Sequence, residues 1–82
     1  MSEVTFYGAE WCSDCRRSKA LLNAEGVEFE LRDVAESAEF TDEAKAISGR
    51  TNIPVIKFAD GHFLVEPSDA DLRDELAKRG LI

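Results

Sequence analysis

The two cysteines of the chain, Cys12 and Cys15, are separated by two residues and lie where a β-rich run gives way to a helical pattern. A disulfide across so short a loop removes little conformational entropy from the unfolded chain, and the chain-entropy model gives it only about 2 kcal/mol. On a helix the two positions share one face, so their sulfur atoms can meet. The pair is therefore better suited to a bond that opens and closes than to holding a fold together.

Hydrophobic patterning divides the chain into seven segments. β-rich or alternating runs predict four strands, and apolar residues three or four apart predict three helices. The predicted strands are residues 4–7, 27–31, 54–58 and 62–65. The predicted helices are residues 13–25, 37–48 and 69–79. The order βαβαββα predicts an α/β fold, in which a right-handed βαβ unit, a hairpin and a last helix form a four-stranded mixed sheet with three helices.

The predicted strands differ in how far they are exposed to solvent. Residues 54–58 form the most continuously apolar run and predict a buried central strand. Residues 27–31 alternate apolar and charged side chains and predict a strand at a sheet edge. Asp60 and Gly61 predict a two-residue hairpin loop before the last strand.

Capping residues predict where the helices begin. Ser68 is expected to cap the last helix, which is followed by Gly80. The middle helix is expected to begin near Ser37, and Asp33 with Glu36 offers an alternative capping box that would start it slightly earlier.

Length and charge exclude several classes of function. The chain has 82 residues, 17 of them acidic and 10 basic, which gives a net charge of −7. We expect one small domain, residues 1–82. The acidic balance argues against binding of nucleic acid or of an anionic membrane surface, and no apolar run approaches the roughly 20 residues that span a bilayer.

The N-terminal segment predicts a cytoplasmic protein. It has no basic region and no apolar run of a secretory signal; a mature chain whose signal had been removed would look the same. In the cytoplasm thiols stay reduced, and a cysteine pair there is more often catalytic or metal-binding than structural.

A CxxC pair that follows a strand, opens a helix and lies in a βαβ unit is typical of thioredoxin-like redox proteins. The chain resembles the glutaredoxin branch of that superfamily, on residues Phe6–Cys15, Asn52–Pro54 and the Asp60-Gly61 hairpin. The resemblance implies a thioredoxin-like, glutaredoxin-type fold and a dithiol–disulfide oxidoreductase. It also implies a cis proline at Pro54 that faces the cysteines.

The segment before the last helix departs from the usual glutaredoxin pattern, in which a Gly-Gly pair helps to bind glutathione. Glu66–Asp69 stands there instead, and together with residues 57–61 it makes the chain more similar to the mycoredoxins, which serve mycothiol. The chain also lacks the Trp-Ser-Gly-Phe-Arg-Pro segment of redoxins that draw electrons from thioredoxin reductase.

The resemblance implies no bound cofactor, with mycothiol or glutathione as a small-thiol co-substrate. Disulfide-bearing or S-thiolated proteins are the expected partners, and a flavin-dependent reductase is a further candidate. We expect a monomer.

Cys12 is expected to be the attacking thiol. A free cysteine with a pKa of about 8.5 is only about 3% ionised at neutral pH, and the free N–H groups and dipole of a helix N-terminus favour the thiolate. Arg16 and Arg17 add positive charge nearby, whereas Glu10 and Asp14 oppose it.

Cys15 lies one turn further along the same helix face. We expect it to resolve the mixed disulfide that Cys12 forms. A monothiol route, in which Cys12 acts alone and a second small thiol releases it, is the alternative.

Further candidates are predicted to bind the substrate around this pair. The backbone of Ile53 is expected to bridge to the substrate, and Pro54 ends that edge because it has no N–H. Ser68 and Asp69 are expected to bind ammonium or hydroxyl groups of a small thiol. Trp11 and Tyr7 are expected to form aromatic walls of the substrate groove. Arg16 is expected to supply a positive charge beside it.

Two other functions stay open. The chain could be an electron-donor redoxin reduced by thioredoxin reductase, or a non-catalytic dimer that binds zinc or an iron–sulfur cluster through four pooled cysteines. A zinc site within one chain is disfavoured because only His62 adds another good ligand, and His62 at the hairpin is expected to be a solvated turn residue.

Overall fold

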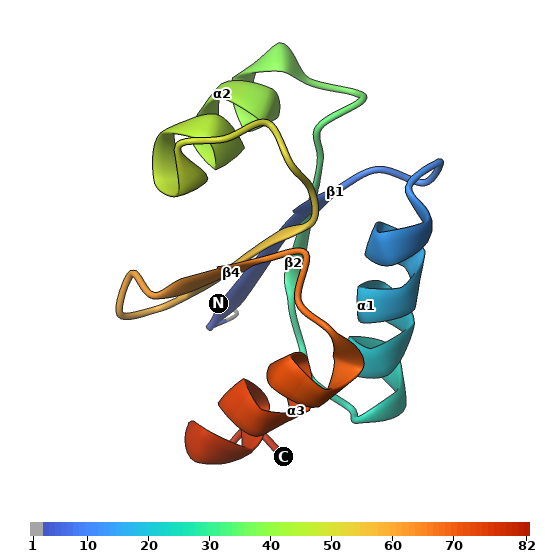
Figure 1. Cartoon of the computed structure of the whole chain (residues 1–82), viewed down its shortest axis with the longest axis vertical. Helices are drawn as coiled ribbons and strands as arrows, with labels where there is room; N and C mark the ends of the chain where they lie inside the picture. The colour runs from blue at the N-terminus through green and yellow to red at the C-terminus, as the bar shows by residue number, and fades with distance from the viewer. Residues whose placement is uncertain (1–2) are drawn as a thin grey trace.

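The computed structural model describes residues 3–82, and its strands and helices follow the predicted βαβαββα order (Figure 1). The strands are β1 (Val4–Gly8), β2 (Glu30–Asp33), β3 (Val55–Phe58) and β4 (Phe63–Val65). The helices are α1 (Ser13–Ala24), α2 (Ala38–Ser48) and α3 (Asp69–Lys78). Within the described residues no helix is long and apolar enough to cross a membrane.

The four strands form one mixed sheet in the order β2-β1-β3-β4. β1 runs parallel to β2 and antiparallel to β3, and β3 runs antiparallel to β4. The predicted positions of two strands are confirmed: β2 is at the sheet edge, and β3 lies inside the sheet with three of its four residues buried.

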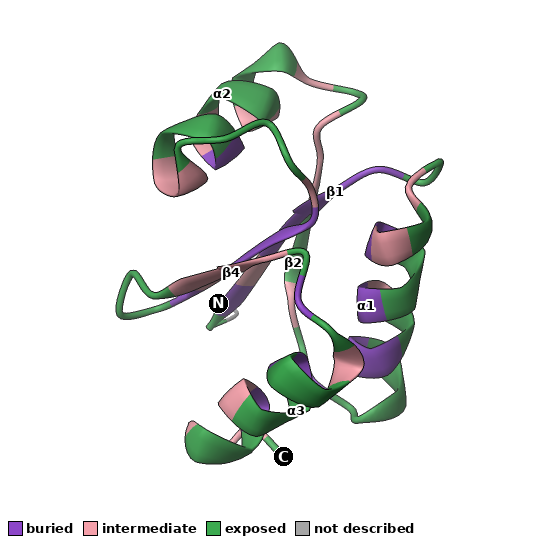
Figure 2. Cartoon of the chain, in the orientation of Figure 1, coloured by how far each residue is buried: buried purple, intermediate pink, exposed green. Residues whose placement is uncertain are grey.

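Helices cover both faces of the sheet, with α2 on one face and α1 and α3 on the other (Figure 1). Alternate side chains of β1 enter the two layers, because successive residues of a strand point to opposite faces. Val4 and Phe6 pack with Leu22 of α1 and Leu72 of α3. Tyr7 packs with the α2 side instead. The buried residues follow this division, along the middle of the sheet and on the inner faces of the helices (Figure 2).

The strand predicted at residues 27–31 starts three residues later and ends two residues later, at Glu30–Asp33. Val27 is buried, but its N–H bonds to the carbonyl of Leu22 at 2.9 Å, which belongs to the end of α1. Phe29 packs on Phe6 with ring centroids 5.8 Å apart. These two residues therefore contribute apolar side chains to the core before the sheet hydrogen bonds begin. Because they alternate with charged residues, they produce the same sequence pattern as a strand.

The hairpin between β3 and β4 has a three-residue loop, so the predicted two-residue loop is wrong. The N–H of Phe58 donates to the carbonyl of His62 at 2.8 Å, and the N–H of Gly61 donates to the carbonyl of Phe58 at 3.0 Å. Gly61 has a φ of 90°, which favours glycine. A turn followed by one residue of positive φ makes such a loop one residue longer than the Asp-Gly pattern predicts.

The N-cap residues of α2 and α3 differ in whether their side chains form a capping hydrogen bond. The Oγ of Ser68 accepts the N–H of Asp71 at 3.1 Å, as predicted for the cap of α3. The alternative capping box of α2 is wrong, because Asp33 accepts the N–H of Ala35 in a turn at 2.8 Å and α2 begins at Ala38. Ser37 occupies the N-cap position of α2 without a side-chain hydrogen bond.

These two serines allow a matched test of the cap. Ser68→Ala is expected to lower the free energy of unfolding by about 1 kcal/mol, because it removes the acceptor of an otherwise free N–H group. Ser37→Ala makes the same chemical change where no such bond exists and is expected to cost less than about 0.5 kcal/mol. Urea unfolding of both variants measures the difference, and equal losses would contradict the assignment.

Candidate active site

Cys12 lies at the N-cap position of α1, at the end of the short loop that follows β1. Its backbone is extended, with φ −88° and ψ 116°, and its N–H donates to the carbonyl of Ala9 at 3.2 Å. The Sγ of Cys12 accepts the N–H of Cys15 at 3.2 Å. The sulfur thus takes the place that a capping hydroxyl or carboxylate usually occupies, where free N–H groups favour negative charge.

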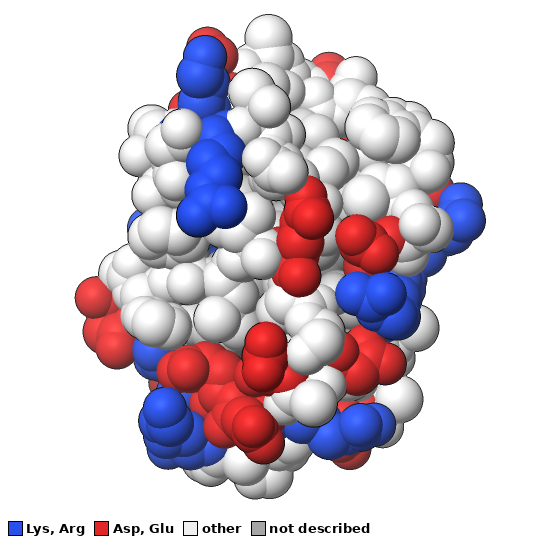
Figure 3. Space-filling view, viewed as in Figure 1, with Lys and Arg blue, Asp and Glu red and all other residues white. Residues whose placement is uncertain are grey.

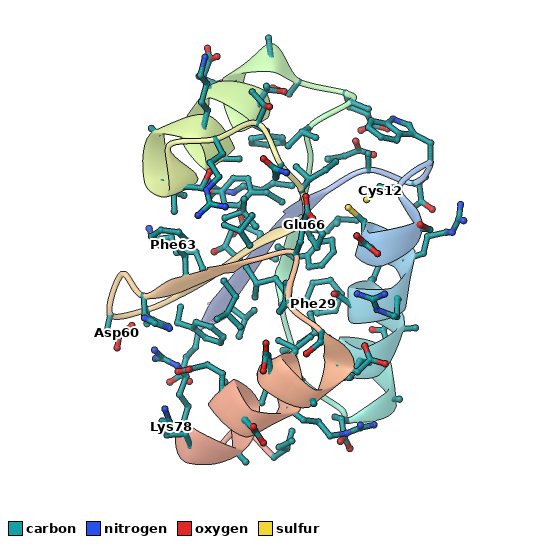
Figure 4. All side chains as sticks on the ribbon, in the orientation of Figure 1. Cys12, Phe29, Asp60, Phe63, Glu66 and Lys78 are labelled. Carbon is teal, nitrogen blue, oxygen red and sulfur yellow. The ribbon has the colours of Figure 1, made fainter. Side chains whose placement is uncertain are left out.

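The segment before β3 brings a backbone carbonyl to the same sulfur. The Sγ of Cys12, which is labelled in Figure 4, lies 3.8 Å from the carbonyl oxygen of Ile53, although 41 residues separate them in the chain. The peptide bond between Ile53 and Pro54 is cis, as the family resemblance implied, and Pro54 is buried.

Cys15 is more deeply buried than Cys12, and this burial changes its pKa. Both are free thiols, but Cys15 is 2% exposed and belongs to the core between the sheet and the helices, whereas Cys12 is half-buried. Burial raises the pKa of the Cys15 thiol to about 12, and the hydrogen bond with Cys12 acts in the same direction. Cys15 is therefore held as a thiol at neutral pH.

Gly8 allows this close packing, a role that the sequence alone did not indicate. A Cβ atom at Gly8 would lie 2.6 Å from the Cε1 of Phe6 and 3.0 Å from the Sγ of Cys15. Both distances are shorter than side-chain carbons ordinarily adopt, so only glycine fits here without a shift of α1 or of Phe6. The one signal in the sequence that could have pointed to this role is that a glycine, and not a strand-forming residue, ends β1.

Arg17 connects the CxxC segment to the start of α3. Its guanidinium lies 3.2 Å from the carboxylate of Asp14 and 3.3 Å from that of Asp69, and it donates to the carbonyl of Pro67 at 3.3 Å. The acidic residue between the two cysteines thus has a cationic partner. Because these side chains are nearly half exposed, each pair is worth little in stability, and its main effect is on the local charge.

Arg16 contacts a different part of the site. It donates to the carbonyl of Glu10 at 3.0 Å, in the loop before Cys12, and the Glu10 carboxylate pairs with Lys19 at 3.1 Å. Arg17, and not Arg16, therefore contacts the start of α3. The role of Arg16 in binding substrate stays a prediction.

The two aromatic candidates are placed very differently. Trp11 is 71% exposed and, with Ile53, lines a cavity beside the cysteines. Tyr7 is 2% exposed on the α2 side, where its hydroxyl donates to Glu43 at 3.0 Å and accepts from Arg32 at 3.2 Å. Burial is the main cause that raises the pKa of Tyr7. The structure does not bring Tyr7 to the cysteines, because strand alternation turns it to the other face of the sheet.

The remaining candidates are engaged within the protein. The Oγ of Ser68 caps α3, and the Asp69 carboxylate lies beside Arg17. His62 is exposed at the hairpin, 3.6 Å from the carboxylate of Glu75. Among residues 3–82 no group of three or more His, Cys, Asp or Glu side chains is arranged to hold a metal ion.

The protonation of Cys15 predicts how stability depends on pH. Its pKa rises from an ordinary value of 9.0 to about 12 in the folded protein, so unfolding between these pH values releases a proton. The free energy of unfolding of the reduced protein should therefore fall as the pH rises above about 9. The slope is a fraction of the roughly 1.4 kcal/mol per pH unit that one full proton would give.

Urea unfolding at several alkaline pH values, under reducing conditions, measures this slope. Cys15→Ser keeps every other titrating group and should show a shallower fall. Equal slopes in the two proteins would show that Cys15 is not held protonated by burial.

Comparison with known proteins agrees with this arrangement. The family model described as Glutaredoxin matches residues 4–64. Mycoredoxin 1 of Corynebacterium glutamicum is 32% identical over 73 residues, which cover 88% of this chain and 90% of that protein. Glutaredoxin 3 of Escherichia coli is 39% identical over 56 residues, or 68% of each chain.

A solved structure is similar over most of the fold. The crystal structure of a glutaredoxin from Archaeoglobus fulgidus superposes with a TM-score of 0.79 at 28% identity, covering 90% of this chain and 85% of that one. The residues that the family model matches span both cysteines and Pro54, and the structural similarity covers 90% of this chain. The chain therefore belongs to the glutaredoxin family, as a thiol–disulfide oxidoreductase with the CxxC pair of Cys12 and Cys15.

Proposed function

We propose that Cys12 attacks the substrate disulfide and that Cys15 resolves the mixed disulfide that results. The observation that carries this order is the difference between the two thiols. Cys12 is half-buried at the helix N-terminus and accepts an N–H bond, whereas Cys15 is fully buried with a pKa of about 12. Cys12 is therefore the sulfur that an external disulfide can reach.

The first step forms a bond between the Cys12 sulfur and one substrate sulfur. The substrate S–S bond breaks, and the other sulfur leaves as a thiolate that takes up a proton. In the second step the Cys15 sulfur loses its proton and attacks Cys12, which releases the remaining substrate thiolate and forms the Cys12–Cys15 disulfide. The substrate disulfide is reduced and the enzyme dithiol is oxidised.

The contacts of Cys15 favour a slow second step. Two causes of its raised pKa, the hydrogen bond with Cys12 and the charge of Cys12, lapse once Cys12 is in a mixed disulfide. Burial, the largest cause, persists. A monothiol route is therefore supported beside the dithiol route, with a second small thiol attacking the mixed disulfide on Cys12.

The backbone of Ile53 is the proposed docking edge for the substrate. Its carbonyl is already 3.8 Å from the Cys12 sulfur, and Pro54 offers no N–H that could extend the edge. A substrate segment that pairs antiparallel with Ile53 would place its disulfide against Cys12. Trp11, which is exposed and lines a cavity together with Ile53, would form a wall of the same groove.

The proposed electron donor is a small thiol, with mycothiol preferred over glutathione. Asp69 and the Ser68 cap stand at the start of α3, where a carboxylate favours hydroxyl or ammonium groups over another carboxylate. The 32% identity with mycoredoxin 1 over 88% of the chain supports the same choice. We place this single-domain protein in the cytoplasm as a monomer that acts on disulfide-bearing or S-thiolated proteins.

Serine substitutions test the order of attack. Cys12→Ser should abolish reduction of both protein disulfides and mixed disulfides, because a serine hydroxyl is not ionised at neutral pH. Cys15→Ser should lose activity on protein disulfides but keep at least about a tenth of the activity on small-thiol mixed disulfides. Ser13→Ala, which leaves both thiols in place, is the control. Loss of all activity in Cys15→Ser would exclude the monothiol route.

The donor is tested by reducing the oxidised protein with mycothiol, with glutathione, and with thioredoxin reductase and NADPH in parallel. Mycothiol is expected to be fastest. Asp69→Asn should slow reduction by mycothiol while reduction by dithiothreitol, which is uncharged, stays unchanged. Reduction by the reductase alone would overturn the choice of donor.

A further inference from the structure

A small hollow reaches the buried thiol of Cys15 from the side of β2. Its lining includes Gly8 at the end of β1, Ala9 in the loop that follows, Cys15 of α1 and Asp33 of β2. A volume of about 10 Å³ in the hollow is open to water, which is about the room that one water molecule needs. The hollow shares no residue with the cavity that Trp11 lines, so it gives water a separate approach to the cysteine pair.

The register of the sheet places Asp33 beside the thiol of Cys15. In the parallel pair of β1 and β2, Gly8 is the partner of Asp33. Phe6, two residues before Gly8 on the same face of β1, packs with Cys15, so the Asp33 side chain points to the α1 face. Gly8 has no side chain, and a Cβ there would lie 3.0 Å from the Cys15 sulfur. The space between Asp33 and the sulfur therefore stays open, and because neighbouring strands are only about 4.8 Å apart, one water molecule spans it.

The two carboxylates that line the hollow, Glu10 and Asp33, differ in their partners. Glu10 pairs with Lys19 at 3.1 Å, and Arg16 donates to the Glu10 carbonyl at 3.0 Å. Among residues 3–82 no basic side chain lies within 4.0 Å of the Asp33 carboxylate. Its Oδ1 accepts the N–H of Ala35 at 2.8 Å, and no described residue donates to its other oxygen. That oxygen is therefore available to a water molecule in the hollow.

The second step of the proposed reaction requires Cys15 to give up its proton inside the core. Burial, the largest cause of its raised pKa, persists in the mixed disulfide. The backbone N–H of Ala9 bonds to the Cys15 sulfur and lowers its pKa, but by less than burial raises it. An N–H group stabilises the thiolate once it forms and takes up no proton. A proton acceptor beside the sulfur would therefore speed this step.

We propose that Asp33 accepts the proton of Cys15, through one water molecule in the hollow, while Cys15 attacks the mixed disulfide. The proton of the Cys15 thiol passes to the water molecule, which gives one of its own protons to the Asp33 carboxylate. A bond forms between the sulfurs of Cys15 and Cys12, the bond from Cys12 to the substrate sulfur breaks, and the substrate leaves as a thiolate. Asp33 then releases its proton to solvent, from which the substrate thiolate takes one up. The proposal rests on the proposed function, in which Cys15 resolves the mixed disulfide.

Reaction of the reduced protein with one equivalent of 2,2′-dithiodipyridine separates the two steps. Cys12 attacks the reagent and releases one pyridine-2-thione, which is followed by absorbance. Cys15 then attacks the disulfide between Cys12 and the pyridine sulfur and releases a second pyridine-2-thione. The rate of the first phase depends on the concentrations of protein and reagent, whereas the second phase is unimolecular and reports the step in which Cys15 loses its proton.

Asp33→Asn keeps an oxygen that accepts the N–H of Ala35 but removes the proton acceptor. At neutral pH its second phase is expected to be at least about tenfold slower than that of the wild type. Its first phase should change by less than about twofold, which also shows that the variant is folded. A purely electrostatic role of Asp33 predicts the opposite sign, because loss of a negative charge favours the Cys15 thiolate.

The pH dependence of the second phase distinguishes proton transfer from a structural effect. In Asp33→Asn the rate should rise about tenfold per pH unit between about pH 6 and about pH 9, because the step then depends on hydroxide or on thiolate already formed. In the wild type the rise should be less steep, so the two rates approach each other at alkaline pH.

Three further variants are matched controls. Glu10→Gln removes the other carboxylate of the hollow, which pairs with Lys19, and should leave the second phase within about twofold of the wild type. Asp74→Asn makes the same chemical change on α3, over which acidic side chains gather on the face shown in Figure 3, and should change neither phase. Asp33→Glu keeps a carboxylate and should retain more of the second-phase rate than Asp33→Asn.

An unchanged or faster second phase in Asp33→Asn would overturn the proposal, because Cys15 would then give its proton directly to solvent. A slower second phase that keeps the pH dependence of the wild type would also overturn it, since a structural disturbance alone produces that result. Failure of the wild type to release a second pyridine-2-thione would instead count against the proposed function, because Cys15 would then not resolve the disulfide on Cys12.

Discussion

The approach of α1 to the end of β1 at Gly8 is the contact on which the rest of the site depends. With no side chain at Gly8, the first turn of α1 packs directly against the sheet, and the Sγ of Cys15 would lie only 3.0 Å from a Cβ there. This packing buries Cys15. It leaves Cys12, one turn earlier, half-buried at the helix N-terminus, where its sulfur accepts the N–H of Cys15. The same backbone geometry thus makes two chemically similar thiols unequal, which an ordered exchange reaction requires.

The charge near Cys12 and Cys15 depends on local side-chain contacts and not on the overall composition of the chain. The acidic Asp14 between the cysteines opposes a thiolate on Cys12 when the sequence is considered alone. In the structure Arg17 lies between Asp14 and Asp69, at 3.2 and 3.3 Å, so one cation faces both carboxylates. The net charge of −7 is therefore a poor guide to the field at the sulfur, because potentials depend on nearby charges more than on distant screened ones.

The groove around Cys12 is bordered by segments from both layers of the fold. Helix α2 covers one face of the sheet and carries Lys45 toward the cavity beside Ile53. The segment before α3 carries Glu66, whose carboxylate accepts an N–H of Asn52 at 2.8 Å, and Asp69 at the start of α3 pairs with Arg17. Contacts between residues far apart in the chain therefore fix the segments on both sides of Ile53.

Much of the fold was predictable because it depends on local patterns. The order of seven elements, the edge position of β2, the inner position of β3 and the Ser68 cap all follow from periodicity or from a residue's own hydrogen-bonding groups. The two cysteines of the site were also recognisable, since CxxC at a strand-to-helix junction is a short-range pattern. The hairpin loop was predicted one residue too short, because a glycine with positive φ, here Gly61, fits a three-residue loop as well as the Asp-Gly pattern of a two-residue one.

By itself the sequence determined the elements, their order and the CxxC pair, since neighbouring residues suffice for those. Only the tertiary structure decided which distant residues meet. It turned Tyr7 to the α2 side, chose Arg17 rather than Arg16 to join Asp14 to Asp69, and required glycine at position 8. Each of these depends on the register and face of packed elements, and a shift of one residue in a strand reverses the face to which its side chains point.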